Sequence, residues 1–260
     1  MRLTWALSAV LVALVGLVGP PAQAAPDVWR PGPEERLHVQ FEGRLSVPSW
    51  ATMVEVDSAD TPASTVRTLR QRGLRTACYI SAGTLERWRD DAHRFPSAVI
   101  GKPMDGWPGE RWLDVRRIAL LAPIMRDRIE RCRAKGFDAI EFDNVDGWAN
   151  DSGFPIARAD SLRYVRWLTR VAHRHGLAVG LKNALGLVRA LADHVQWALN
   201  EECVHYLECD RYAPMVQRGK PVFVLEYGGS HERMCRVARK AGLFAQQKRL
   251  SLDAWSRPCL

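Results

Sequence analysis

One local pattern recurs along this chain: a basic amphipathic stretch, then a glycine, then a short apolar run. The glycines of its five copies are Gly73, Gly136, Gly176, Gly219 and Gly242. Glycine just past the end of a helix supplies the left-handed cap, and cations in the last helical turn suit the helix dipole. The pattern therefore predicts helices that each lead directly into a strand.

Apolar runs of strand length occur eight times. The predicted strands are Leu37–Phe41, Thr52–Val56, Leu74–Ile80, Phe137–Phe142, Leu177–Leu181, His194–Leu199, Val222–Leu225 and Leu243–Ala245. Strands that alternate with helices imply a parallel sheet covered by helices, and eight strands favour closure over an open sheet. The predicted fold class is therefore α/β, a single (β/α)8 TIM barrel.

Two segments fit this prediction less simply. The link Gly43–Trp50 is shorter than the dozen or so residues of a parallel crossover, so either it is compressed or the first strand lies outside the barrel. The segment Ser81–Arg111 shows no strand pattern and is rich in Trp, Gly and Pro. A loop of that length inside a compact domain is usually functional or disordered, and its tryptophans argue against disorder.

The first 24 residues have the pattern of a secretory signal peptide. A short cationic start precedes the apolar run Ala6–Gly19, and Ala22-Gln23-Ala24 fits the rule for cleavage after Ala24. The apolar run is too short for a comfortable span, although an uncleaved membrane anchor is the alternative. We therefore expect residues 25–260 to form one secreted domain, extracellular or in the cell envelope, with no stable membrane insertion after cleavage.

Export predicts that the six cysteines form disulfides, because thiols outside the cell are usually oxidised. Sequence alone allows 15 pairings of six cysteines into three disulfides. The spacing suggests that Cys203 and Cys209 close one loop and that Cys235 and Cys259 tie the C-terminal tail to a helix. Cys78 would then pair with Cys132, unless those two remain buried free thiols.

A formal net charge of +8 raises the question of a nucleic-acid partner. The basic residues are spread along helical stretches such as Arg126–Lys135 and Arg163–Arg174, which is typical of a solvated outer face. No compact run interleaves basic and aromatic residues, so we expect no nucleic acid among the partners. We expect the domain to be a monomer.

Nearly every predicted strand ends in polar residues, and most of these ends carry an acid. The residues at these ends are Asp57, Ser81, Asp143, Asp146, Lys182, Asn183, Asn200, Glu201, Glu226 and Tyr227. In a TIM barrel the active site lies at the carboxyl ends of the strands, so this selectivity predicts an acidic site there.

Glycoside hydrolysis requires two carboxyl groups, one to protonate the leaving oxygen and one to act as nucleophile or to activate water. Asp143 and Glu201 are the best pair, since each ends an apolar strand and is followed by a loop. Glu141 lies on the same side of its strand as Asp143 but one layer deeper. We interpret it as a structural acid paired with Lys182 inside the barrel.

Tryptophans give a second indication of a sugar. Sugars stack an apolar face on indole rings, so Trp88, Trp107, Trp112 and Trp148, in segments near the acidic strand ends, fit a saccharide cleft. Ordinary packing explains any one of them equally well. No H-E-x-x-H spacing, phosphate loop or dinucleotide fingerprint appears, so we expect no metal and no cofactor, although Glu141, Asp143 and Asp146 are the acids that a hard cation would use.

Seven segments, in order along nearly the whole of the chain that follows the signal, resemble glycoside hydrolase family 114, the endo-α-1,4-polygalactosaminidase-like TIM-barrel proteins. They are Met53–Asp57, Cys78–Thr84, Gly106–Asp114, Gly136–Gly147, Gly176–Asn183, Asn200–Cys203 and Val222–Tyr227.

The resemblance implies hydrolysis of an α-1,4-linked, galactosamine-containing polysaccharide, with Asp143 as nucleophile and Glu201 as acid/base. A cationic amino sugar also gives the acidic rim a purpose. Glu202 departs from the family pattern, where glutamine is more typical, so the acid/base is either Glu201 or Glu202. The substrate-binding candidates are Asp57, Tyr79, Trp107, Glu110, Asp114, Asn144, Asp146, Trp148, Lys182, Asn183, Glu226 and Tyr227.

Two rival hypotheses remain open at this point. A secreted carbohydrate-binding barrel without catalysis would keep the tryptophans but lack one acid of the pair. A metal-dependent phosphoesterase or deacetylase would use the same acids and lose activity in a chelator.

Overall fold

The computed structural model describes Met1 and residues 27–260 of the chain, so the predicted signal peptide lies almost wholly outside the described residues. Within residues 27–260 no helix combines the length and apolar composition needed to cross a bilayer.

Eight parallel strands form the central sheet of the described chain. In sheet order they are β1 (Leu37–Val39), β2 (Met53–Asp57), β3 (Arg75–Ser81), β7 (Ala139–Asp143), β8 (Ala178–Lys182), β9 (Trp197–Glu201), β10 (Val222–Glu226) and β11 (Phe244–Lys248). A short strand, β12 (Ser256–Pro258), pairs antiparallel with β11. All eight predicted strands are present, in the predicted order.

The sheet closes nearly into a barrel. Side-chain and loop contacts join its two ends: Gln246 Nε2 on β11 donates to the carbonyl of Leu37 on β1 at 2.6 Å, and Phe41 N donates to the carbonyl of Leu252 at 2.9 Å. The prediction of a TIM barrel is confirmed. The first strand belongs to it, since β1 pairs in parallel with β2, and the short β1–β2 connection is compressed and contains no helix.

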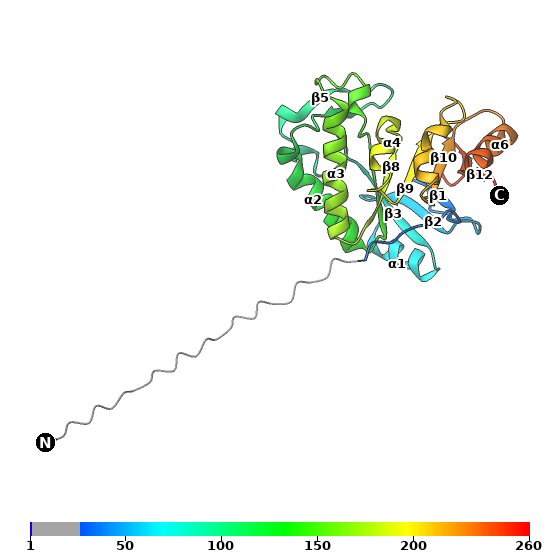
Figure 1. The fold of residues 1–260 in the computed structure, drawn as a ribbon, viewed down its shortest axis with the longest axis horizontal. Coiled ribbons are helices and arrows are strands. Elements are labelled where there is room, and N and C mark those ends of the chain that lie inside the picture. The colour runs from blue at the N-terminus through cyan, green and yellow to red at the C-terminus, as the bar shows by residue number, and fades with distance from the viewer. Residues whose placement is uncertain (2–26) are drawn as a thin grey trace.

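Helices cover the outside of the barrel. They are α1 (Ala63–Gln71), α2 (Ile118–Lys135), α3 (Arg158–Arg174), α4 (Val188–Leu191), α5 (Ala213–Val216) and α6 (His231–Ala241). The long helices α2 and α3 lie side by side on one side of the sheet and α6 on the other (Figure 1). α4 and α5 have one turn each, so the β8–β9 and β9–β10 connections are short. These outer layers bury the outward faces of the strands, with Val56, Ile80, Ile140 and Leu181 in one cluster.

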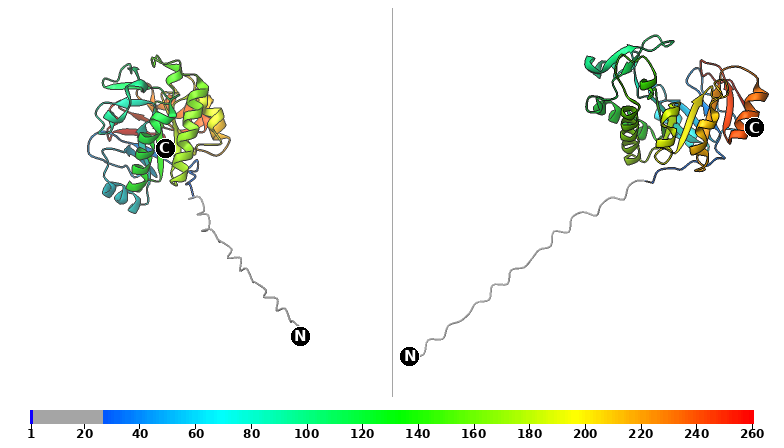
Figure 2. Two further views of the ribbon diagram at one scale, coloured as in Figure 1. Left: turned by 90° about the vertical axis from the view of Figure 1, so that its left-hand side faces the viewer. Right: turned by 45° about the horizontal axis from the view of Figure 1, so that its top comes forward.

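The segment after β3 contradicts the prediction that it has no strand of its own. It contains β4 (Thr84–Glu86), β5 (Ile100–Pro103) and β6 (Glu110–Leu113), paired antiparallel in the order β4-β6-β5. This small sheet lies beyond one end of α2 and α3, as the teal segment in Figure 2 shows. Each strand has three or four residues, too few for an alternating pattern to be recognised in a sequence.

Three disulfides join the cysteines in the pairs that the spacing suggested. Cys78 on β3 bonds Cys132 on α2, Cys203 bonds Cys209 in the loop after β9, and Cys235 on α6 bonds Cys259 in the C-terminal tail. The first pair fixes α2 against the barrel. The second braces the loop that begins two residues after Glu201.

Candidate active site

Side chains at the carboxyl ends of neighbouring strands converge at one end of the barrel. Asp143 and Lys182 are the last residues of β7 and β8, and Glu201 is the last residue of β9. Tyr79 lies near the end of β3, and Tyr227 directly follows β10. Parallel strands bring their carboxyl ends to the same edge, so residues far apart in sequence meet here.

One ammonium group joins the two predicted acids. Lys182 Nζ lies 3.1 Å from Asp143 Oδ2 and 3.1 Å from Glu201 Oε2. The two oxygens are therefore no farther apart than twice that distance. Burial by itself lowers the pKa of Lys182, but the charges of Asp143 and Glu201 reverse this and hold it well above its ordinary value. The lysine is a fixed cation between two carboxyl groups.

Glu201 is surrounded by donors. Besides Lys182, Asn183 Nδ2 donates to its Oε2 at 3.0 Å, and the Tyr227 hydroxyl donates to its Oε1. Asn183 also accepts the backbone N–H of Glu201 at 2.8 Å, which fixes the strand end. Burial raises the pKa of Glu201, but Lys182, Tyr227 and Asn183 outweigh burial, and the net pKa lies below the ordinary value.

The structure separates Glu201 from Glu202. Glu201 is the acid that contacts Lys182, whereas Glu202 has a positive φ of 64° and its N–H donates to the carbonyl of Leu225 at 2.7 Å. A residue in this backbone conformation ends the strand and breaks its alternation. The carboxyl group that joins the cluster is therefore that of Glu201.

Asp143 also accepts several hydrogen bonds. Tyr79 Oη donates to Oδ2 at 3.2 Å, and the Asn144 N–H donates to Oδ1 at 2.6 Å. Asn144 turns away from the strand with a φ of 59°, and its amide donates to Ser81 Oγ at 3.0 Å and approaches Glu110 Oε2 at 3.5 Å.

Glu110 is a buried acid with no cationic partner among the described residues. Its Oε2 accepts from Thr84 Oγ1 at 2.6 Å. Burial is the main reason that its pKa rises to about 6, and the charges of Glu86 and Asp143 act in the same direction. This places an acid that titrates near neutral pH beside the strand-end cluster.

Other rim candidates have partners within the protein. Arg89 binds both oxygens of Asp57, at 2.9 and 2.6 Å, and Arg116 binds both oxygens of Asp114, at 2.7 and 2.9 Å. Glu226 is buried and accepts the N–H of Val204 at 2.8 Å. The expectation that Asp57, Asp114 and Glu226 attract substrate is therefore not supported by their contacts. Asp146 is partly exposed, and burial together with the charge of Asp143 raises its pKa.

The four tryptophans fall into two groups. Trp88 and Trp107 are about half exposed and lie in the insertion between β3 and α2, where a Cβ on Gly109 would lie 3.0 Å from the Trp88 ring. Trp112 is buried and packs near Gly147, and Trp148 packs against the core. The sugar interpretation suits the exposed pair. Trp112 is a packing residue.

Glu141 was expected to pair with Lys182, and this prediction is wrong. Glu141 is fully buried one layer below Asp143, as its position in β7 implied, but neither of its carboxyl oxygens has a hydrogen-bond partner. Lys182 contacts the two acids of the upper layer instead. Alternation along a strand indicates the face of a side chain but not which of several acids a lysine will reach.

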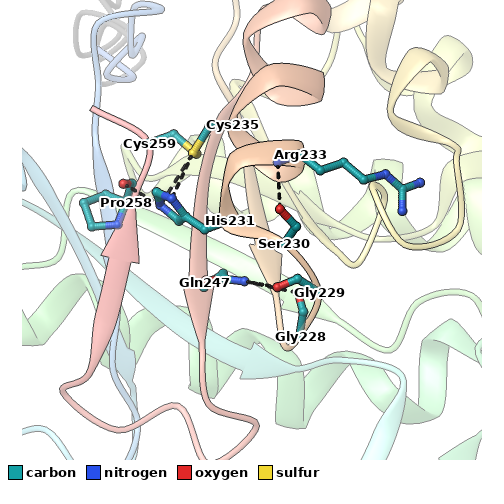
Figure 3. The surroundings of a disulfide bond; sticks show 9 residues. All are labelled: Gly228, Gly229, Ser230, His231, Arg233, Cys235, Gln247, Pro258 and Cys259. Carbon is teal, nitrogen blue, oxygen red and sulfur yellow. Dashed lines mark hydrogen bonds between the residues drawn. A yellow bond between two sulfur atoms is a disulfide. The ribbon is translucent and has the colours of Figure 1, made fainter.

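Among the described residues, one group of three has a spacing that a metal could use: His231, Cys235 and Cys259. Figure 3 shows that the two sulfurs are joined in a disulfide, with His231 Nε2 3.5 Å from Cys235 Sγ and 3.1 Å from the carbonyl of Pro258. A disulfide has no thiolate to offer a metal, so this group braces the tail.

Several residues near the site escaped the sequence predictions. Arg89 contacts Asp57 from a loop distant in sequence and also contacts Glu86, and Glu55 on β2 is fully buried beside the cluster. The stapled loop after β9 carries Tyr206 and Leu207 with their side chains exposed. Glu55 was recognisable, since it is a carboxylate inside an apolar strand, as Glu141 is.

A nearly closed parallel barrel with two carboxyl groups at the carboxyl ends of its strands has the arrangement of a glycoside hydrolase. The comparisons with known proteins agree. A family model described as glycoside-hydrolase family GH114 matches residues 19–260, so the chain belongs to this family and is a glycoside hydrolase.

Solved structures and one curated relative are also similar to the chain. The crystal structure of Aspergillus fumigatus Ega3 in complex with galactosamine is 33% identical, with a TM-score of 0.85, and the match covers 92% of this chain and 100% of that chain. The glycoside hydrolase domain of PelA from Pseudomonas aeruginosa shares the fold, at 14% identity and a TM-score of 0.68 over 85% of this chain and 96% of that chain. An uncharacterized protein of Deinococcus radiodurans is 28% identical over 229 residues, which are 76% of this chain and 71% of the relative.

Proposed function

We propose that the mature chain is a secreted, endo-acting hydrolase of α-1,4-linked polysaccharides that contain galactosamine, with Asp143 as nucleophile and Glu201 as acid/base. The observation that carries this proposal is the shared contact of both carboxyl groups with Lys182 Nζ. It brings together the two acids that the reaction requires at the position where barrel enzymes act.

The spacing of the two acids favours a retaining course. Retaining enzymes place the carboxyl groups about 5 to 5.5 Å apart and inverting enzymes about 6.5 to 9.5 Å apart. Asp143 Oδ2 and Glu201 Oε2 each lie 3.1 Å from Lys182 Nζ, so these two oxygens are at most twice that distance apart, a limit that lies below the inverting range. Asp143 then attacks the anomeric carbon while Glu201 protonates the leaving oxygen, and Glu201 next removes a proton from the attacking water.

Glu201 must gain a proton before it can act as an acid. In the free protein its donors favour the carboxylate, but the side chain is still 26% exposed. A sugar that covers it removes this remaining water, and desolvation raises the pKa of a carboxyl group. Substrate binding therefore shifts Glu201 in the direction that a general acid needs.

The chemistry of the rim favours a cationic amino sugar. Glu110 has no cationic partner among the described residues and lies beside Asn144, next to Asp143, while Trp88 and Trp107 offer exposed indole faces on the insertion. An ammonium group matches the acid, and the apolar face of a pyranose matches the indoles. The Ega3 structure was solved with galactosamine, which is consistent with this substrate class.

The test is to incubate the purified protein with partially deacetylated polygalactosamine and to follow oligosaccharide release. We expect cleavage within chains, and we expect Asp143→Asn and Glu201→Gln each to lose roughly 2 to 4 orders of magnitude in rate. Glu202→Gln is the matched control and should stay near wild type. Binding without cleavage, unchanged in Asp143→Asn, would instead establish the carbohydrate-binding alternative.

The two roles can be assigned separately. Sodium azide should rescue Glu201→Ala and Asp143→Ala on an activated substrate. In Glu201→Ala azide attacks the glycosyl-enzyme in place of water and needs no general base, and in Asp143→Ala it attacks the anomeric carbon in place of the missing carboxylate. In Glu201→Ala the azide product should keep the anomeric configuration of the substrate, and in Asp143→Ala it should have the opposite one. The reverse result would exchange the roles of the two acids.

Secretion is part of the proposal. It rests on the N-terminal pattern, which predicts that the mature chain begins at Ala25. Mass spectrometry of the protein recovered from the medium or the cell envelope of an expressing bacterium checks this. We expect the mature protein to be a monomer in solution.

A further inference from the structure

Two carboxyl groups inside the barrel have no hydrogen-bond donor among the described residues. Glu55 on β2 and Glu141 on β7 are both fully buried, and none of their four carboxyl oxygens accepts a hydrogen bond from a donor of the described residues. A carboxylate left in this state costs several kcal/mol, so an ionised pair is not a stable arrangement. Protons on these groups remove the cost.

The strand order explains how the two groups meet. β3 lies between β2 and β7, and opposite Glu55 it carries the small, fully buried residue Ala77. Glu141 pairs with Tyr79 two residues farther along β3. Two long acids reaching over one small residue can bond to each other, and such a bond requires a proton on one of them.

The surrounding charges act in opposite directions. Burial is the largest influence on both groups and raises the pKa of each. The charge of Glu55 also raises the pKa of Glu141, whereas Glu141 as a hydrogen-bond partner lowers the pKa of Glu55. Lys182 on β8 favours ionisation of the pair, whereas Asp143 on β7 and Glu201 on β9 oppose it. Lys182 is already bound by these two acids, and their negative charges offset its attraction for Glu55 and Glu141 in the layer below.

We propose that Glu55 and Glu141 are a proton-holding acid pair that stays neutral while the enzyme works and so leaves the charge of Lys182 to Asp143 and Glu201. The pair is a positioning device, and this role rests on the proposed function of the two upper acids. At high pH the pair ionises, the new charge on Glu141 competes for Lys182, and the catalytic acids lose their shared cation. The loss of activity on the alkaline side then follows the buried pair.

Glu55→Gln and Glu141→Gln test this inference. An amide resembles a neutral carboxylic acid in shape but cannot ionise, so both variants should keep kcat/KM within about threefold of wild type at slightly acidic pH. The alkaline limb of kcat/KM should move to higher pH in both variants while the acidic limb stays in place. The matched control is Glu232→Gln on the exposed face of α6, which should move neither limb.

A loss of more than about tenfold at slightly acidic pH in folded variants would overturn the proposal, because it would mean that the charge of the pair is required. An alkaline limb that stays in place in both variants would overturn it as well.

Infrared spectroscopy of the wild type gives a readout that needs neither a variant nor activity. With isotope-labelled glutamate, the carbonyl stretch of a protonated carboxylic acid should persist at neutral pH and disappear as the pH is raised through the alkaline limb. The absence of this band at neutral pH would overturn the inference. A persistent band in a protein that cleaves no polysaccharide would support the neutral pair and overturn the proposed function.

Discussion

Gly180 on β8 lies directly against the indole ring of Trp197 on β9, so close that a Cβ on the glycine would lie 2.3 Å from a ring atom. Trp197 is fully buried inside the barrel and packs near Phe223, with ring centroids 5.8 Å apart. The indole fills the interior two strand positions below Lys182. Packing here therefore supports the layer in which the acids and the lysine meet.

Gly180→Ala should destabilise the protein by about 1 to 3 kcal/mol, because the new methyl group overlaps a ring that is enclosed on all sides. Chemical denaturation measures the loss. Gly228→Ala is the control, since a Cβ there meets no atom within 4 Å, and we expect a change within about 0.5 kcal/mol. Equal stabilities for the two variants would mean that the barrel interior adapts more freely than its packing indicates.

Arg89→Met should destabilise the protein by about 3 to 5 kcal/mol at neutral pH, because it leaves two buried acids, Asp57 and Glu86, without their shared cation. Burial already holds the pKa of Glu86 above its ordinary value, and loss of Arg89 raises it further. A carboxyl group whose pKa is raised in the folded state stabilises the fold at a pH below its ordinary pKa, and this stabilisation is lost as the pH rises. The defect should therefore be smaller at pH 5 than at pH 8.

The control for this variant is Arg236→Met, which removes an exposed pair with Glu232 on α6 and should cost at most about 1 kcal/mol. Denaturation at both pH values compares the two variants. A defect in Arg89→Met that does not depend on pH would show that the arginine acts through packing of its stem.

The repeated pattern allowed the barrel to be predicted, because five of the eight parallel strands are apolar runs that a glycine-capped helix precedes. Because a barrel brings the carboxyl ends of its strands to one side, Asp143 and Glu201 were predicted as a pair, whereas Lys182 was assigned to Glu141 and instead joins the pair. The three cysteine pairs followed from spacing, since two of them are close in sequence and leave the third.

Long-range choices between equivalent partners were not predictable. Asp57 is neutralised by Arg89 from a loop 32 residues away, and no local pattern reveals such a contact. The same limit applies to Lys182, which contacts Glu201 rather than Glu141. The insertion after β3 was missed because its strands are stabilised by pairing with one another, which a sequence does not show until the register is known.

The three disulfides should differ in their effect on stability. In the loop-closure model, replacing both cysteines of the Cys78–Cys132 pair by alanine costs about 4 kcal/mol, and replacing the Cys203–Cys209 pair costs about 2 kcal/mol. The difference follows from sequence separations of 54 and 6 residues. Thermal unfolding of the two double variants tests the order, and the reverse order would show that the short bridge holds more than its own loop.

Lys182→Met should lower kcat/KM by about 10² to 10³-fold, the usual effect of removing one preorganised charge from an active site. Lys182 is the main influence that holds the pKa of Glu201 down against burial. Without this cation the folded-state pKa of Glu201 rises and the residue keeps the proton of a general acid to higher pH, so the alkaline limb of the pH–rate profile should move to higher pH. Lys220→Met is the control, because Lys220 Nζ binds only the carbonyls of Ala192 and Val195 among the described residues, away from the acids. An alkaline limb that stays in place in a folded Lys182→Met variant would mean that the ionisation of Glu201 is set by Tyr227 and Asn183, and that the lysine serves only to hold the strand ends together.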